Sequence, residues 1–324
     1  MTQLPSFDEL PVRAGAPAGS SWGLWGDDDV LGCLNLLTPE RVQAATHCAV
    51  DGAVFSLNLE LELPDPPLFG RRSVHHVVLD TSSGHDDEID GFNTQSSTQW
   101  DGFRHVRHFA HGYYNGIDDA QHGVHHWSRR GIVGRGVLVD VALFRERAGR
   151  PIVAGAPDPI EPDDIIGALA DQRVTVEVGD ILLIRTGWLA WYRSLTFEQR
   201  SAYAEERVPA CCGLRPGTES ARMLWDLHVA AAAADNPGFE VMPPGALHSP
   251  VALSVLRQQP EQAEEWFLHS SIIAKLGLVV GELFDLDALA AACHADRRYT
   301  CLFTSAPLNL LNGVASPPNA LAIR

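Results

Sequence analysis

Basic side chains are scarce in this chain. Its 324 residues include 24 Lys and Arg against 41 Asp and Glu, which gives a formal net charge of −17 at pH 7. Binding to nucleic acid or to an anionic lipid surface depends on clustered positive charge, so this balance argues against both kinds of partner.

Long apolar runs and targeting signals are also missing. The longest apolar stretch near the C-terminal end, IIAKLGLVVG, is interrupted by Lys275 and is too short to span a bilayer. The N-terminal sequence MTQLPSFDELPVR has neither the basic nor the apolar segment of a signal peptide. Six scattered Cys form no C-x-x-C pair, which is typical of buried thiols in a reducing compartment. We expect a soluble, cytoplasmic protein without a membrane partner.

Several motifs of nucleotide binding and hydrolysis are absent. The chain has no G-x-G-x-x-G after a strand, no P-loop, no G-x-S-x-G and no H-E-x-x-H. The phrase GIVGRGV at 131–137 is not followed by a helical pattern, so it indicates entry into a strand. The sequence therefore predicts neither a nucleotide cofactor nor serine-hydrolase chemistry.

Helical and strand patterns alternate along the chain. Periodicity and breakers predict helices at 36–50, 161–170, 196–207, 219–228, 265–276 and 285–294, and strands at 54–63, 73–79, 131–144, 179–188, 229–236, 277–286 and 299–308. Thr38 is the expected N-cap of the first helix, and Asp163 or Asp164 that of the second. Interleaved elements indicate an α/β or α+β fold. We expect an N-terminal arm at 1–20 and a single domain at 21–324.

The segment 80–130 is polar and irregular, and a stretch of this kind inside a compact domain is usually functional or disordered. Its aromatic residues and His argue against disorder. Asp101, His105, His108 and His111 fall within eleven residues of it. Because titratable groups cluster at functional sites, these residues are the first candidate site. His at every third position would lie along one face of a helix.

Two further candidate sites lie in the second half of the chain. His269 falls in an apolar helical pattern and Glu282 near the end of an apolar strand. A carboxylate buried there needs a metal, a cation or a hydrogen-bond donor, whereas one that caps a turn faces water. Polar residues at two other strand ends could line a pocket or form a buried ion pair, with the ion pair favoured: Arg185, Thr186, Trp188, Asp235 and Glu240.

Seven phrases, in their order and spacing, carry a resemblance to a known family. They are WGLWGDDDVLGCLNLLTPERV, STQWDGFRH, YYNG, GIVGRGVLVDV, GDILLIRTGW, LHSSIIAKLGLVVGELFDLDAL and SAPLNLLNGVASPPNALAI. With these phrases the chain resembles the cyclase superfamily of metal-dependent hydrolases, which includes bacterial kynurenine formamidase and isatin hydrolase. The resemblance runs from about Trp22 to Ile323. It implies a swivelling β/β/α fold and a homodimer or homotetramer.

The signature of that family is H-x-G-T-H-x-D-x-P-x-H. Aligned on Asp101, it places Gln95 and Gln99 where the family has the two His of its first metal. It implies that Asp101 binds or bridges metal and that His105 is the acid–base group. Phe103 stands where the family has Pro.

Further along the chain, the His and Glu of the family's second metal match His269 and Glu282. Gln offers only a neutral carbonyl oxygen, a weaker ligand for Zn²⁺ than imidazole, so a binuclear zinc centre is not expected. Asp101, His269 and Glu282 can still hold one divalent ion, with Mn²⁺, Mg²⁺ and Zn²⁺ all open. A site without metal is the alternative, in which the two Gln donate to a substrate oxyanion.

The resemblance implies a hydrolase that cleaves a C–N or C–O acyl bond in a small, cyclic or aromatic amide, formamide or lactone. A metal-activated water would attack the carbonyl, His105 would take or deliver the proton, and Gln99 would donate to the oxyanion. The expected substrate-binding residues are Gln95, Trp100, Phe103, His108, Tyr113 and Tyr114. The aromatic members of this set fit core positions equally well.

Two other functions remain open on the sequence. One is a metal-free cyclase, lyase or dehydratase of secondary metabolism that uses His105 and Asp101 as acid and base. The other is a non-catalytic ligand-binding relative. The retention of four polar groups in apolar settings argues against the second, because burying such groups without use is costly.

Overall fold

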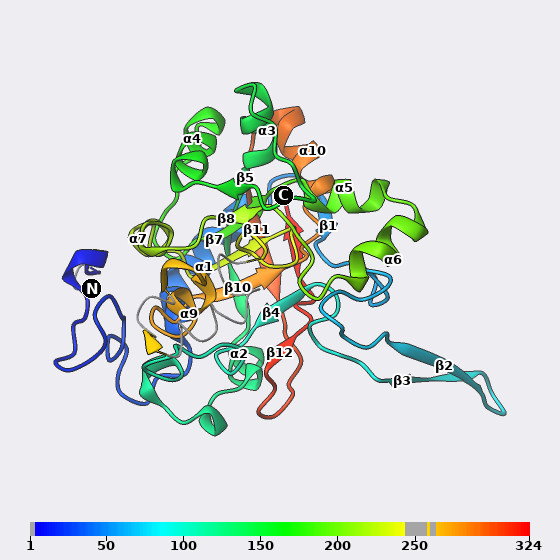
Figure 1. Cartoon of the computed structure of the whole chain (residues 1–324), viewed down its shortest axis with the longest axis horizontal. Coiled ribbons are helices and arrows are strands. Elements are labelled where there is room, and N and C mark those ends of the chain that lie inside the picture. Colours follow the sequence, from blue (N-terminus) through cyan, green and yellow to red (C-terminus); the bar gives the residue numbers. More distant parts are fainter. Residues whose placement is uncertain (1–3, 244–257, 260–263) are drawn as a thin grey trace.

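A nine-stranded mixed sheet is the centre of the computed structural model, which describes residues 4–243, 258–259 and 264–324 (Figure 1). Its strand order is β1-β13-β11-β5-β7-β9-β10-β4-β12. These strands are β1 (Val54–Ser56), β13 (Leu321–Ile323), β11 (Thr300–Ser305), β5 (Ile132–Asp140), β7 (Ile181–Arg185), β9 (Ala231–Ala234), β10 (Val279–Glu282), β4 (Gln99–Asp101) and β12 (Ala315–Ser316). Two small sheets pair β2 (His75–Asp80) with β3 (His85–Asp90), and β6 (Pro159–Ile160) with β8 (Gly213–Leu214).

Helices surround this sheet, as Figure 1 shows. They are α1 (Pro39–Ala45), α2 (Val124–Arg130), α3 (Val141–Arg147), α4 (Pro162–Gln172), α5 (Trp188–Ser194), α6 (Phe197–Glu205), α7 (Thr218–Asp226), α9 (Leu268–Ile272) and α10 (Asp287–Asp296). Strands β5, β7, β9 and β10 run parallel to one another, and the other pairs of the nine-stranded sheet are antiparallel. The predicted α+β class is confirmed. No helix in the described part of the chain is both long and apolar enough to span a bilayer.

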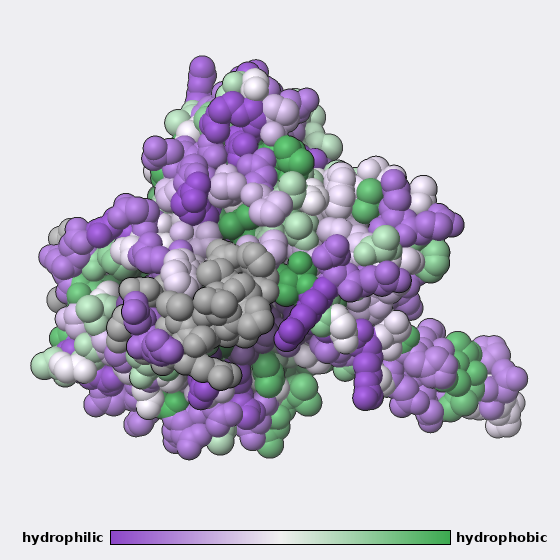
Figure 2. All heavy atoms as spheres, viewed as in Figure 1, coloured by the Kyte–Doolittle hydropathy of each residue, from purple (hydrophilic) through white to green (hydrophobic). Residues whose placement is uncertain are grey.

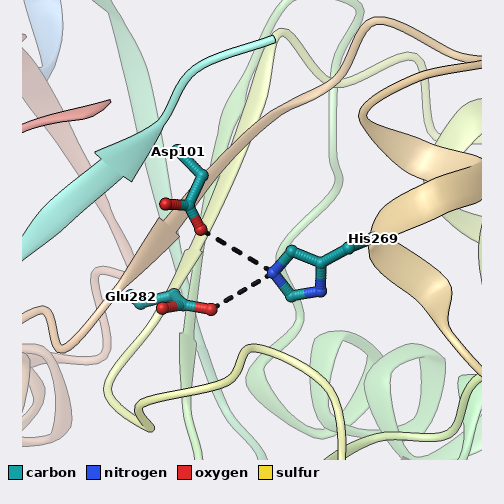
Figure 3. Close-up of side chains that lie close together, drawn as sticks. All are labelled: Asp101, His269 and Glu282. Atoms are coloured by element: carbon teal, nitrogen blue, oxygen red, sulfur yellow. Dashed lines mark hydrogen bonds and ion pairs between the residues drawn. The ribbon is translucent and has the colours of Figure 1, made fainter. Parts of the chain in front are cut away.

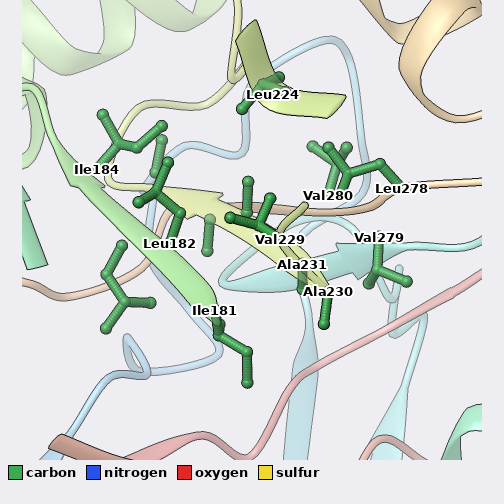
Figure 4. Close-up of a cluster of buried hydrophobic side chains, with 14 of the residues drawn as sticks. Ile181, Leu182, Ile184, Leu224, Val229, Ala230, Ala231, Leu278, Val279 and Val280 are labelled. Carbon is green, nitrogen blue, oxygen red and sulfur yellow. The ribbon is translucent and has the colours of Figure 1, made fainter. Parts of the chain in front are cut away.

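The apolar core forms around the parallel strands. Parallel strands are covered on both faces, and accordingly Ile181, Leu182, Leu183 and Ile184 of β7 are fully buried. Figure 4 shows members of this cluster from β7, β9 and β10 together with Leu224 of α7. The four successive Ala of β9 leave room beside the larger side chains of its neighbours.

Several predicted boundaries are wrong for identifiable reasons. The strand expected at 54–63 ends at Ser56, because the backbone N–H of Leu59 donates to the Thr98 hydroxyl at 2.8 Å instead of continuing a ladder. The strand expected at 131–144 ends at Asp140, whose carboxylate accepts from Leu143 N at 2.9 Å and starts α3. Helix α9 ends at Ile272 and is shorter than the predicted 265–276.

The predicted helix caps have two outcomes. Thr38 caps α1 by accepting from Arg41 N, which confirms that prediction. The cap of α4 is Glu161, which forms a capping box with Asp164, so neither predicted Asp is the N-cap. The run after β4, at 102–111, consists of turns, so its three His do not share a helix face as expected.

Two peripheral segments lie against or beyond this body. The N-terminal segment lies against α7. Trp225 Nε1 of this helix donates to Pro5 O at 2.9 Å, and Arg222 pairs with Asp8 at 2.6 Å. The β2–β3 hairpin projects from the body and exposes the apolar side chains of Val78 and Ile89 (Figures 1 and 2). The domain boundary at 20/21 and the homodimer or homotetramer stay predictions.

Candidate metal centre

Strand pairing brings three polar side chains together from distant parts of the sequence. Strand β4 pairs antiparallel with β10 so that Gln99 lies opposite Glu282 and Asp101 opposite Val280. Successive side chains of a strand point to opposite faces, so Gln99 and Asp101 share one face. Gln99 Nε2 donates to Glu282 Oε2 at 2.6 Å and reaches Asp101 Oδ1 at 3.4 Å.

His269 faces this pair of strands from α9, and Glu240 fixes its position. The Glu240 carboxylate accepts from the backbone N–H groups of Leu268 and His269 at 2.6 and 3.0 Å. The same carboxylate accepts from His269 Nδ1 at 2.5 Å. A carboxylate behind an imidazole orients the ring and leaves the other nitrogen for a metal, as is usual for metal-binding His.

The second ring nitrogen of His269, Nε2, points toward two carboxylates, as Figure 3 shows. His269 Nε2 lies 3.2 Å from Glu282 Oε1 and 3.7 Å from Asp101 Oδ2. Ligand atoms of these three buried residues all lie within 4.8 Å of one another. The predicted set Asp101, His269 and Glu282 is therefore one cluster in space.

The unsatisfied atoms of the cluster fit a cation. Asp101 Oδ2 and Gln99 Oε1 are buried and have no hydrogen-bond partner among the described residues. A buried oxygen without a donor costs roughly 1–3 kcal/mol, and a bound cation would remove that cost. Carboxylate, amide and imidazole donors together suit Mn²⁺, Mg²⁺ or Zn²⁺. The donor set thus fits a single divalent ion.

Gln95 links the cluster to His105. Its Nε2 donates to Asp101 Oδ1 at 2.8 Å and lies 3.0 Å from His105 Nδ1. His105 Nε2 is 4.0 Å from Asp101 Oδ1. The His105 side chain keeps 29% of its surface exposed, whereas Asp101 is fully buried. His105 is therefore a titratable member of this group that lies close to Asp101 and is accessible to solvent.

Burial and neighbouring charges set the protonation states of the cluster. Burial, with the charge of Asp101 nearby, raises the pKa of Glu282 to about 7. Burial lowers the pKa of His105. For His269, burial disfavours the charged ring, but hydrogen bonds to the surrounding carboxylates raise its pKa well above the usual value. Burial alone would raise the pKa of Asp101, yet the nearby His105 and His269 lower it to about 2. Ions and protons therefore compete for the same atoms.

A cavity of about 230 Å³ opens onto the cluster. Its described lining residues are Phe69, Arg71, His105, Pro237, Met242, Phe267, His269 and Glu282. The Phe267 ring stacks on the His269 ring, with centroids 5.4 Å apart and planes 12° apart. Binding pockets usually measure about 300–1,000 Å³, so this cavity suits a small ligand.

The aromatic residues expected to bind substrate belong to the core instead. Trp100 points away from Gln99 and Asp101, packs on Phe284 with centroids 4.9 Å apart, and is fully buried. Phe103 and Tyr114 pack on each other at 4.7 Å and are also buried. The predicted aromatic wall is therefore wrong for these three residues, and the aromatic lining comes from Phe69 and Phe267.

The other expected binding residues lie off the cavity or are already bonded. His108 is buried, stacks on His111 and lies 3.0 Å from Glu264 Oε1. Tyr113 is half-buried and is not among the described lining residues. Gln99 uses both N–H groups on carboxylates, which leaves none for a substrate oxyanion in this arrangement.

The third candidate site separates into two parts. Arg185 pairs with Asp140 and Asp287 at 3.2 and 2.8 Å, so the favoured ion pair with Asp235 or Glu240 is wrong. Asp235 accepts from the backbone and hydroxyl of Thr186, both at 2.7 Å, and has a structural role. Glu240 instead joins the candidate metal centre through His269. Residue patterns did not reveal this, since the two residues are 29 positions apart.

In this α+β fold, two carboxylates and an imidazole point toward one buried position beside the mixed sheet. They define a candidate metal centre. Comparison with known proteins supplies the family. The family model described as "Putative cyclase" matches residues 42–241, more than half of the chain. The chain belongs to the cyclase family. No curated protein sequence matches it.

Solved structures share the fold over most of the chain. A crystal structure described as a novel cyclase has 28% identity and a TM-score of 0.76, and the match covers 94% of this chain and 99% of that one. Isatin hydrolase A from Labrenzia aggregata has 17% identity and a TM-score of 0.56, covering 87% and 97%. Isatin hydrolase A from Ralstonia solanacearum has 15% identity and a TM-score of 0.55, covering 88% and 97%. The two isatin hydrolases are similar in fold alone.

Proposed function

We propose that this chain is a single-metal hydrolase of a C–N or C–O acyl bond in a small cyclic or aromatic amide, formamide or lactone. The observation that carries the proposal is the convergence of Asp101, His269 and Glu282 within 4.8 Å, beside a cavity that also contains His105. The isatin hydrolases that share the fold support the acyl-bond chemistry.

The cation would be held by Asp101, His269 and Glu282, with Gln99 Oε1 as a further donor. When bound, a divalent cation polarises a carbonyl and lowers the pKa of water. Glu240 would keep the His269 ring in the orientation for binding, because its carboxylate is fixed by two backbone N–H groups. These residues would also orient the acyl group toward His105.

His105 would act first as the general base and then as the general acid. Since burial lowers its pKa, the imidazole is neutral near pH 7 and has a ring nitrogen that can take a proton. Asp101, 4.0 Å away, would stabilise the imidazolium that forms. His105 would then return the proton to the leaving nitrogen or oxygen. Phe69 and Phe267 would contact an aromatic or cyclic substrate and exclude water from the cavity.

Metal content and turnover test this proposal together. Untagged wild-type protein should contain about one divalent ion per chain by plasma mass spectrometry, and Glu282→Ala should lose it. A panel of formanilides, cyclic amides and lactones should yield a substrate. His105→Ala should retain the ion but lower kcat by about 10²- to 10⁴-fold, the usual contribution of a general acid–base group. His47→Ala, an exposed His, is the matched control.

Each alternative has its own outcome. Wild-type protein that binds no ion after soaking in Mn²⁺ and Zn²⁺, yet turns over a substrate in chelator, would replace the proposal with metal-free acid–base chemistry. Tight ligand binding without turnover would replace it with a binding protein. Near-normal turnover by His105→Ala on a verified substrate would remove His105 from the mechanism.

A further inference from the structure

Arg71 supplies a positive charge beside the cavity. Its guanidinium lies over the Phe69 ring, with Cζ 5.1 Å from the ring centroid, and Nη1 donates to the Gln95 carbonyl. These two contacts fix the position of the side chain. Cation–π stacking and a carbonyl acceptor hold a guanidinium without neutralising its charge.

The charge of Arg71 has no carboxylate partner within 4.0 Å among the residues that the structure describes. By contrast, Arg185 and Arg193 elsewhere in the fold pair directly with Asp. Arg carries five N–H donors, and in Arg71 a single one reaches a described acceptor. Most of its fork is therefore available to a ligand in the cavity that it lines.

The charge of Arg71 acts on Asp101 and Glu282 across the site, but neither carboxylate pairs with it within 4.0 Å. Glu240 is committed to His269 and to two backbone N–H groups. Asp101 and Glu282 bond to Gln side chains and would be neutralised further by the proposed cation. Among the lining residues that the structure describes, Arg71 is then the charged group that remains for recognition.

We propose that Arg71 binds an anionic group on the substrate, so that the chain acts on small acyl compounds that also carry a carboxylate. The guanidinium would donate two parallel hydrogen bonds to this carboxylate, in the bidentate geometry that Arg favours. The apolar body of the substrate would lie against Phe69, Phe267 and Met242, with its acyl bond toward His105. The volume of about 230 Å³ limits this body to a compact group. This inference rests on the proposed function for the acyl bond and on Arg71 alone for the anion.

An equilibrium binding experiment tests Arg71 without turnover. The probes are benzenesulfonate, an anion that coordinates divalent cations weakly, and methyl phenyl sulfone, its neutral counterpart. In calorimetry, wild type should bind the sulfonate at least about tenfold more tightly, the low end for a hydrogen bond to a charged group. Arg71→Met keeps the stem and should lose this preference. Arg72→Met, an exposed neighbour outside the cavity lining, should keep it.

Kinetics on two compounds with the same acyl bond then test whether Arg71 recognises a carboxylate on the substrate. Formanilide and its ring-carboxylated derivatives present the same acyl bond, so Arg71→Met should lower kcat/KM by about tenfold or more for a carboxylated member and hardly at all for formanilide. An equal loss on both would mean that Arg71 acts on the acyl group that both compounds share, which overturns the inference. Equal probe binding by wild type, no sulfonate binding at millimolar concentration, or preference retained in Arg71→Met would also overturn it. If wild type hydrolyses neither compound nor any other acyl substrate, the proposed function fails while the binding result still judges Arg71.

Discussion

Metal binding to this site should depend strongly on pH, because the cation and protons use the same atoms. Glu282 has a pKa raised to about 7 by burial, and His269 has a pKa raised well above its usual value by the surrounding carboxylates. Both groups must release their protons before they can act as ligands. Raising the pH through 7 therefore favours the cation, and lowering it favours the protons.

The size of the effect follows from Glu282. A carboxyl with a pKa near 7 is about 10% ionised at pH 6 and about 90% ionised at pH 8, so its proton alone weakens metal binding about tenfold at the lower pH. Titration of His269 acts in the same direction and increases this factor. We expect the Kd for Mn²⁺ to be at least about tenfold higher at pH 6 than at pH 8.

The assay is calorimetric titration of metal-stripped protein with Mn²⁺ at both pH values. Repeating it in two buffers of different ionisation enthalpy measures the protons released per ion. Glu282→Gln removes one titrating ligand, so this variant should bind Mn²⁺ more weakly than wild type. Its ratio of Kd at pH 6 to Kd at pH 8 should be about tenfold smaller than that of wild type. Equal Kd values at pH 6 and pH 8 for wild type, with no proton release, would refute the reasoning and remove Glu282 and His269 as ligands.

Two further predictions concern residues around the ligands. Glu240→Ala should lower the free energy of unfolding by about 3–5 kcal/mol in urea titration, because it leaves the buried Nδ1 of His269 and two backbone N–H groups without their acceptor. Glu219→Ala, whose side chain is 79% exposed, should change it by less than about 0.5 kcal/mol. A loss no larger for Glu240→Ala would contradict the assigned contacts. The double variant Gln95→His/Gln99→His should raise the zinc content from about one to about two ions per chain by plasma mass spectrometry, because imidazole is the better Zn²⁺ ligand; an unchanged content would show that the site cannot take a second ion.

The members of the candidate metal site were predictable from the sequence, but their geometry was not. Motif spacing and family resemblance identified Asp101, His269 and Glu282, and the structure places them together. The pairing of β4 with β10 spans 183 residues between Gln99 and Glu282, and no local pattern reveals such a contact. The contact of Glu240 with His269 was not predicted for the same reason, because it depends on where α9 begins.

Strand parity would have corrected the assignment of Trp100. Gln99 and Asp101 point to one face of β4, so the residue between them must point to the other face. Gly281 lies opposite Trp100, and a Cβ there would come within 2.7 Å of the indole. The polar signature and the aromatic core therefore alternate along one strand. Arg71 gave no comparable signal, because an Arg next to another Arg usually indicates a solvated surface.

The two Gln that replace family His would also account for the single cation proposed for this site. Gln99 donates to Glu282 Oε2, and Gln95 donates to Asp101 Oδ1. A second cation would need these same carboxylate lone pairs, and an amide N–H cannot share them with it. The amide donors thus balance part of the negative charge that a second ion would otherwise neutralise. Asp101 Oδ2, Glu282 Oε1 and His269 Nε2 remain directed at one point, which supports a single ion held between β4, β10 and α9.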